Sequence, residues 1–220
     1  MALASPTTRR TFLELAMQMD ALRFGAFTLK SGRNSPYFFN AGQFNTGASL
    51  AALAGCYVDA LEADGVAFDL LFGPAYKGIP LATAVACEYA RRGRDLEVAF
   101  NRKEAKTHGE GGSLMGAPVA GKRALIVDDV ITAGTAIREA IGHIENAGGT
   151  VAGIVIALDR QEVLDVANPV SAVDAVRAAT GVPVVAVATL NDLLDFAHDA
   201  PELKQHHDAL LAYRSTYGSN

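Results

Sequence analysis

Five short apolar runs recur along the chain, and segments with the apolar spacing of helices lie between them. The runs cover residues 69–72, 96–100, 123–127, 151–158 and 182–187. The segments predicted as helices cover residues 48–64, 78–92, 135–147, 169–180, 190–198 and 201–217. Runs that are apolar throughout fit strands that are covered on both faces. The alternation therefore predicts an α/β fold with a central, mostly parallel sheet flanked by helices, as one compact unit over residues 46–220.

The first 45 residues do not join this alternation. Residues 7–22 have the apolar spacing of an amphipathic helix, and residues 27–40 read as two strands around a Gly/Asn/Ser/Pro turn. We predict an N-terminal helix and a small hood over the sheet, within residues 1–45. Residues 102–118 form a polar, glycine-rich stretch without periodicity, too long for an ordinary connection, which predicts a disordered or functional loop.

The amino-acid composition argues against some classes of binding partner. The net charge is -5 and the pI is about 5.5, which argues against non-specific nucleic-acid binding because that depends on Lys and Arg. No apolar stretch reaches the length of a membrane span. Cys56 and Cys87 lie in apolar, predicted helical stretches without a Cys-x-x-Cys motif, which is typical of packing in a reducing compartment. We expect a cytoplasmic protein with no nucleic-acid or membrane partner.

The most informative local feature is a predicted buried strand that ends in Asp128 and Asp129, followed by a loop of Thr and Gly and then a helix. Ligands of open α/β sheets bind beyond the carboxyl ends of the strands. The helix start offers free N–H groups and the positive end of its dipole, and Gly134 lets the backbone approach closely. We predict a phosphate site in this loop, with carboxylates suited to ribose hydroxyls or a hydrated metal ion. The loop residues are Val130, Ile131, Thr132, Ala133, Gly134, Thr135 and Ala136.

Taken alone, each polar segment has a simpler interpretation. The Asp128 segment could be a strand end with a Thr helix cap, or a Walker B strand, although the chain has no Gly-x-x-x-x-Gly-Lys-Ser/Thr loop. The segment 72–78 could be a plain turn with exposed Lys77. The segment 101–112 could be a solvated surface loop, and Arg160 in the segment 158–162 could be part of a surface ion pair.

Together the segments point to one family. Residues 124–136 resemble the phosphoribosyl pyrophosphate signature of the type I phosphoribosyltransferases. With the segments 27–32, 35–40, 72–78, 101–112 and 158–162, the chain resembles the orotate phosphoribosyltransferases in order and spacing from about residue 24 to 162. The resemblance implies magnesium-dependent transfer of ribose 5-phosphate from phosphoribosyl pyrophosphate to orotate, giving orotidine 5′-phosphate and pyrophosphate in UMP biosynthesis.

The resemblance also implies residue roles. Lys103 looks like the catalytic lysine, acting with Asp128 and Asp129. The residues assigned to phosphoribosyl pyrophosphate are, besides the loop 130–136, Lys30, Tyr76, Lys77, Arg102, Lys103, Lys106, His108, Asp128 and Asp129. Tyr76 follows a peptide that is commonly strained in the family. The residues assigned to orotate are Lys30, Phe38, Phe39, Thr132 and Arg160, the last through a planar guanidinium suited to a carboxylate.

The resemblance implies a cofactor and a partner as well. Magnesium is held mainly by substrate and water, so no residue is assigned as a direct ligand. In the family the long loop covers the neighbouring subunit's site, which implies a homodimer with shared active sites. Thr107 stands where many members carry an acidic residue, and this bears on the kinetics of loop closure. Two rivals are a transferase for another base, which Lys30 and Arg160 oppose, and a non-catalytic sensor, which the acidic balance opposes.

Overall fold

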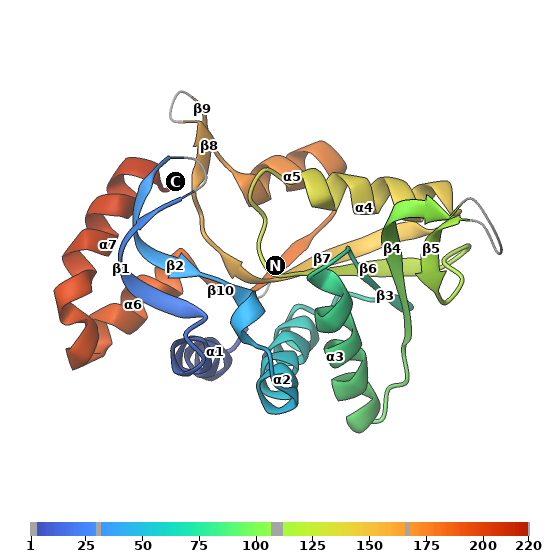
Figure 1. Cartoon of the computed structure of the whole chain (residues 1–220), viewed down its shortest axis with the longest axis horizontal. Coiled ribbons are helices and arrows are strands. Elements are labelled where there is room, and N and C mark those ends of the chain that lie inside the picture. Colours follow the sequence, from blue (N-terminus) through green and yellow to red (C-terminus); the bar gives the residue numbers. More distant parts are fainter. Residues whose placement is uncertain (1–3, 30–31, 107–111, 166–167, 220) are drawn as a thin grey trace.

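A computed structural model describes residues 4–29, 32–106, 112–165 and 168–219. Its centre is a six-stranded sheet in the order β10-β7-β6-β3-β4-β5, with helices on both faces (Figure 1). The strands are β3 (Leu70–Gly73), β4 (Glu97–Lys106), β5 (Gly112–Gly116), β6 (Arg123–Asp128), β7 (Thr150–Asp159) and β10 (Val184–Thr189). Every neighbouring pair is parallel except β4 and β5, which are antiparallel. The predicted fold class is confirmed.

The helices form two layers. One face of the sheet carries α1 (Pro6–Gln18), α2 (Gly47–Asp64) and α3 (Gly78–Arg91), and the other carries α4 (Thr135–Asn146) and α5 (Ala172–Thr180) (Figure 1). Beyond β10 lie α6 (Leu190–Asp199) and α7 (Lys204–Tyr217), beside the hairpin of β1 (Leu22–Thr28) and β2 (Asn34–Phe39). Two short 3-10 helices, η1 (Ala41–Gln43) and η2 (Pro201–Leu203), connect these parts.

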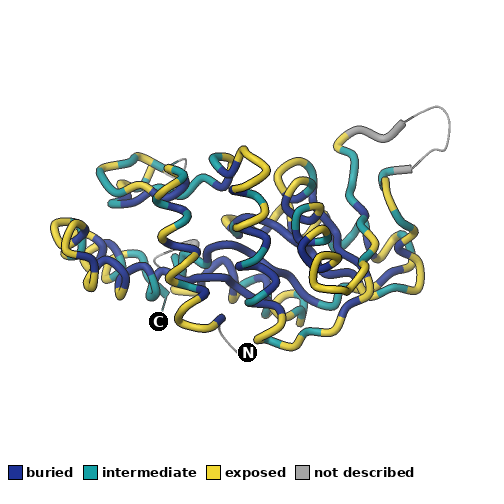
Figure 2. The backbone as a smooth tube through the Cα atoms, turned by 90° about the horizontal axis from the view of Figure 1, so that it is seen from below, coloured by how far each residue is buried: buried dark blue, intermediate teal, exposed yellow. Residues whose placement is uncertain are grey.

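The sheet separates two hydrophobic cores. Along each strand, side chains point alternately to the two faces. Leu71, Leu125 and Val155 contact the core beneath α1, α2 and α3, while Leu70 and Ile126 contact the core beneath α4 and α5. The buried backbone accordingly runs through the middle of the molecule (Figure 2). Burial on both faces is why the strand runs are apolar throughout and could be recognised in the sequence.

The N-terminal helix is shorter than predicted. It begins after Ser5, whose hydroxyl accepts a hydrogen bond from Thr8 N (3.1 Å), and it ends at Gln18. Asp20 has a φ of 54°, so the chain turns there, and Leu22 already belongs to β1. The predicted helix over residues 7–22 was therefore wrong at its end. The two predicted strands around the turn are confirmed as the antiparallel pair β1 and β2.

Two hairpins were missed. The predicted loop over residues 102–118 contains the end of β4 and the whole of β5, which pair with each other, while residues 107–111 lie outside the described residues. A second pair, β8 (Val163–Asp165) and β9 (Asn168–Ser171), precedes α5, so that helix begins at Ala172 rather than 169. Such hairpins satisfy their backbone groups by pairing with each other. Their apolar residues are too few and too scattered in the sequence to form a recognisable period.

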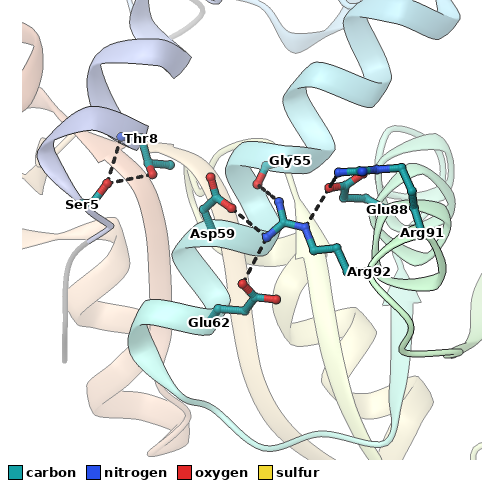
Figure 3. A network of polar contacts seen from close by, with 8 residues as sticks. All are labelled: Ser5, Thr8, Gly55, Asp59, Glu62, Glu88, Arg91 and Arg92. Carbon is teal, nitrogen blue, oxygen red and sulfur yellow. Dashed lines mark hydrogen bonds and ion pairs between the residues drawn. The ribbon is translucent and has the colours of Figure 1, made fainter.

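Beneath the sheet, charged side chains join α2 to α3 (Figure 3). Arg92 contacts Asp59 (Nη1–Oδ1, 2.8 Å), Glu62 (Nη1–Oε2, 3.0 Å) and Glu88 (Nε–Oε1, 2.8 Å), and Arg91 also binds Glu88 at 2.7 Å. We call these five residues the α2–α3 clamp. The hydrogen bonds from Arg91, followed by those from Arg92, lower the pKa of Glu88 to about 2. Within the described residues, no helix is both long and apolar enough to cross a membrane.

Candidate functional site

The predicted site segments meet at one edge of the sheet. Strands β7, β6 and β3 are parallel neighbours, and each ends at this edge. The segment 74–77 follows β3, the segment 129–134 follows β6, and the segment 160–162 follows β7. The carboxyl ends of parallel strands form the usual ligand site of such sheets. The aspartate pair therefore lies between the Lys77 segment and the Arg160 segment, as the sequence interpretation required.

Asp128 and Asp129 are buried side chains held by neighbouring polar groups. The backbone N–H of Asp129 donates to Asp128 Oδ1 (2.9 Å), and that of Val130 donates to Asp129 Oδ1 (2.9 Å). Lys77 Nζ lies 2.7 Å from Asp129 Oδ2. From α2, the fully buried Tyr57 donates its hydroxyl hydrogen to the backbone carbonyl of Asp128 (2.8 Å). Sequence analysis did not find Tyr57, because an apolar helix carries no sign of which ring reaches the site.

Among the described residues, one cation, Lys77, forms an ion pair with this pair of carboxylates. Burial, and then the charge of Asp129, raise the pKa of Asp128 to about 7, while Lys77 acts in the opposite direction with a smaller effect. A carboxyl group with a pKa near 7 can accept or donate a hydrogen bond near neutral pH. A raised pKa at the edge of a cavity is typical of a functional site.

A cavity of about 250 Å³ opens beside Asp128 and is otherwise lined by residues 130–137. Gly134 begins α4 with a φ of 71°, and a Cβ there would lie 2.8 Å from Val176 Cγ2, so only glycine fits. No side chain of the described residues caps this helix start, which leaves its N–H groups directed at the cavity. Arg138 Nη2 holds the loop by donating to Ala133 O (2.9 Å). The hollow suits a phosphate bound by N–H groups at a helix start.

The segment after β3 is shaped by Asn101, another residue that the sequence did not reveal. Asn101 Oδ1 accepts a hydrogen bond from Ala75 N (2.9 Å), and the peptide bond between Ala75 and Tyr76 is cis. Tyr76 is exposed, and Lys103 Nζ of β4 lies 4.9 Å from the centre of its ring. Lys103 is therefore brought beside the Tyr76–Lys77 segment of its own chain.

The remaining cations assigned to pyrophosphate are less fully described. Arg102 is half-buried in β4, and its Nε has no hydrogen-bond partner among the described residues. Lys106 ends β4, but nothing is described of its side chain. Lys30 and His108 lie outside the described residues. The roles of these four residues stay predictions.

Arg160, the residue assigned to orotate, lies just beyond β7 and contacts the β1–β2 hairpin. Its Nε donates to the Tyr37 hydroxyl (3.2 Å), and its Nη2 lies 2.7 Å from Glu162 Oε1. The guanidinium is 5.4 Å from the centre of the Tyr37 ring. Tyr37 belongs to β2, so a strand more than a hundred residues away in sequence contacts the predicted base-binding arginine.

Phe38 and Phe39 follow Tyr37 in β2, and their rings have different neighbours. Phe39 lies 6.0 Å from Phe12 of α1, at the edge of the core. Phe38 lies 5.6 Å from Phe27 of β1. Because successive residues of a strand point to opposite faces, the two rings do not line one surface. Their assignment to orotate stays a prediction.

The order of the strands, with an acidic pair at the end of β6 and an anion-sized hollow before α4, fits the sequence resemblance to the phosphoribosyltransferases. The family described as "Phosphoribosyl transferase domain" matches residues 43–185, and the chain belongs to it.

Relatives with high sequence identity show which group within this family the chain resembles. An orotate phosphoribosyltransferase of Xanthomonas campestris pv. campestris is 66% identical over 212 residues, covering 96% of this chain and 97% of the relative. One from Stenotrophomonas maltophilia is 64% identical over 210 residues, covering 96% of each. The crystal structure of the Francisella tularensis orotate phosphoribosyltransferase has 41% identity and a TM-score of 0.85, covering 94% of this chain and 99% of that one. Within the family, the chain thus belongs to the orotate phosphoribosyltransferases.

Proposed function

We propose that the chain transfers ribose 5-phosphate from phosphoribosyl pyrophosphate to orotate, forming orotidine 5′-phosphate and pyrophosphate. The observation that carries this proposal is the adjacency of two unlike sites on neighbouring strands. The cavity beside Asp128 at the end of β6 suits a sugar phosphate, and Arg160 at the end of β7 suits an anionic ring. The names of the relatives support the same substrate pair.

The reaction breaks the bond between ribose C1 and a pyrophosphate oxygen, while an orotate ring nitrogen forms the new bond to C1 and releases its proton, which the leaving pyrophosphate can accept. Asp128 and Asp129 orient the ribose hydroxyls, and the N–H groups at the start of α4 hold the 5′-phosphate. Lys77 and Lys103 stabilise the negative charge on the leaving pyrophosphate. Because the attacking nitrogen belongs to the substrate, positioning contributes strongly and no nucleophilic side chain is needed.

Magnesium is part of the proposal. Asp128 and Asp129 supply the hard oxygen donors that this ion prefers, and the cavity beside Asp128 leaves room for substrate oxygens and water, which would supply most of the ligands. When bound, the ion neutralises charge on the pyrophosphate. These residues fit such an ion.

The direct test follows the ultraviolet absorbance of orotate with phosphoribosyl pyrophosphate and magnesium. The proposal expects consumption that depends on both additions, and no use of uracil, adenine or guanine. Arg160→Ala should raise the KM for orotate by about 100-fold, because a charged pair is lost, and change the KM for phosphoribosyl pyrophosphate little. Use of a purine in place of orotate, or equal loss for both substrates, would contradict the proposal.

We also propose a homodimer with shared sites, in which the loop after Lys106 acts on the partner's site. Mixed subunits test this. Lys106→Ala mixed with Asp128→Asn should regain about a quarter of the activity, because half of the random dimers carry one intact site of two. Lys103→Ala mixed with Asp128→Asn is the matched control. Since Lys103 lies beside Tyr76 of its own chain, that mixture should stay inactive. Equal recovery or equal failure of the two mixtures would refute the arrangement.

The cytoplasm is the proposed location. Both cysteines are free, as is usual in a reducing compartment. Cys56 is buried, as the predicted packing requires, whereas Cys87 is exposed, so the packing prediction was wrong for Cys87.

A further inference from the structure

Two side chains hold the guanidinium of Arg160, and the sequence analysis assigned no role to either of them. Tyr37 accepts a hydrogen bond from Arg160 Nε at 3.2 Å, and Glu162 Oε1 forms an ion pair with Nη2 at 2.7 Å. The triangle is closed by the Tyr37 hydroxyl, which donates to the same Oε1 of Glu162 at 3.1 Å. We call these three residues the Arg160 triangle. Each member contacts both others.

The triangle is largely shielded from water. Tyr37 is fully buried, and the side chains of Arg160 and Glu162 are only 19% and 13% exposed. Burial keeps the pKa of the Tyr37 hydroxyl well above its ordinary value, although Arg160 opposes this shift. The hydroxyl therefore keeps its hydrogen and can donate to Glu162 while accepting from Arg160. Polar contacts of this kind are stronger in a medium of low dielectric constant.

The contacts leave one nitrogen of the guanidinium, Nη1, without a polar partner among the described residues. Arginine presents its N–H donors in a fixed planar fork. The polar partners of Arg160 among the described residues lie on Nε and Nη2. The edge that carries Nη1 is therefore the open edge, where a ligand can bind. Two parallel donors on one edge are the arrangement that binds a carboxylate through both oxygens.

The segment that carries the triangle is itself anchored from two sides. Gln161, with a φ of 47°, accepts a hydrogen bond on its backbone oxygen from Ser219 N (2.7 Å), and its side-chain oxygen accepts one from Asn191 N (3.0 Å). Asn191 belongs to α6, and Ser219 follows α7. From α7, the Tyr213 ring packs edge-on against Tyr37 with 6.1 Å between ring centres. Arg160 therefore has little freedom to turn.

We propose that Tyr37 and Glu162 are positioning residues for the acidic base, and that they hold Arg160 with its open edge toward the orotate carboxylate. This inference rests on the proposed function. Glu162 stays bound to Nη2 when orotate binds, because Nη1 is available to the orotate carboxylate. The opposite case, in which Glu162 blocks the arginine until orotate displaces it, predicts the opposite change in affinity.

Tyr37→Phe and Glu162→Gln test the inference, since each keeps the shape of the side chain. Each should raise the KM for orotate by about tenfold, the effect of losing one hydrogen bond to a charged group. The KM for phosphoribosyl pyrophosphate and kcat should stay within about twofold, because the phosphate cavity belongs to β6 and α4. Tyr89→Phe is the matched control, since Tyr89 is a buried ring on α3 that packs on Phe68 instead. It should change neither KM.

Each possible result of these measurements either supports or overturns the inference. A selective rise in the KM for orotate in both variants supports the inference. An unchanged KM for orotate overturns it, as does a parallel rise in both KM values, which would indicate general loss of structure. A lower KM for orotate in Glu162→Gln would show that Glu162 competes with the substrate and would also overturn it. A wild-type protein that consumes no orotate would instead refute the proposed function.

Discussion

The molecule holds two groups of buried carboxylates with opposite electrostatics. At the sheet edge, Asp128 and Asp129 are 8% and 6% exposed and share the single nearby cation Lys77 among the described residues. In the α2–α3 clamp, Glu88 is also 8% exposed but contacts two arginines. The pKa of Asp128 rises to about 7, whereas that of Glu88 falls to about 2. Side chains of similar exposure thus show opposite shifts: burial, and then the charge of Asp129, raise the pKa of Asp128, whereas the hydrogen bonds from Arg91 and Arg92 outweigh the effect of burial on Glu88.

The difference separates a binding site from a structural contact. The clamp satisfies its charges within the chain, so it stabilises the packing of α2 on α3 and offers nothing to a ligand. The aspartate pair keeps two carboxylates beside a cavity with one ion-paired cation, Lys77, among the described residues, and the proposed ligand would bind there. Such local conflicts are expected at functional sites.

The largest expected effect concerns activity. Asp128→Asn should lower kcat with orotate about 100-fold, because it removes a charge from the reacting centre while keeping the shape of the side chain. Glu88→Gln, an identical chemical change at an equally buried acid, should leave kcat unchanged. Steady-state orotate consumption measures both variants. Similar losses in the two would show that the comparison does not distinguish site from clamp.

A second effect concerns stability and its dependence on pH. Since the folded protein holds the Asp128 proton up to about pH 7 and the unfolded chain releases it near its ordinary pKa of 3.8, this group's contribution to stability falls as pH rises between these values. Asn does not titrate. Asp128→Asn should therefore be more stable than wild type at pH 8, by at most about 4 kcal/mol, since each tenfold change in proton affinity is worth about 1.4 kcal/mol.

Thermal unfolding at pH 5 and pH 8 measures this second effect. The advantage of Asp128→Asn should be larger at pH 8 than at pH 5. An equal gain in stability at pH 5 and pH 8 would show that ionisation of the buried Asp128 carboxylate does not destabilise the wild-type protein.

The third effect tests the clamp. Arg92→Ala removes contacts to Asp59, Glu62 and Glu88, and should lower the free energy of unfolding by about 2 kcal/mol, because Glu88 is buried and Arg91 alone must then neutralise it. Arg10→Ala is the control. Its pair with Glu14 on α1 is 59% and 55% exposed, so the loss should stay below about 0.5 kcal/mol. Urea unfolding measures both, and equal losses would contradict the clamp.

The sequence analysis predicted the features whose residues lie close together along the chain. The strand, the aspartate pair, the loop 130–136 and the start of α4 are contiguous, so local rules located the phosphate cavity. Buried strands such as β7 were found within two residues because both of their faces are apolar. Parallel order then places the end of β7 beside that of β6, which is why Arg160 was assigned to the same edge.

What the sequence did not reveal depends on contacts between distant segments. Tyr37 and Glu162 are 125 residues apart, and neither segment carries a pattern that predicts their hydrogen bond. Asp59 belongs to α2 and Arg92 directly follows α3, and the relative rotation of these two helices is set only by packing. The β4–β5 hairpin was missed for a related reason, since its apolar residues are too few and too scattered to leave a period in the sequence.

The smallest effect concerns Tyr57, which links the two regions. Helix α2 carries Tyr57 toward the sheet edge, where its hydroxyl binds Asp128 O, and carries Asp59 toward the clamp. Tyr57→Phe should cost about 1 kcal/mol, the net value of one neutral hydrogen bond. If the two regions act independently, the double variant Tyr57→Phe with Arg92→Ala should lose the sum of the single losses within about 0.5 kcal/mol in urea unfolding. A larger departure from additivity would mean that α2 couples the clamp to the aspartate pair, so that a change at one group of carboxylates alters the stability contributed by the other.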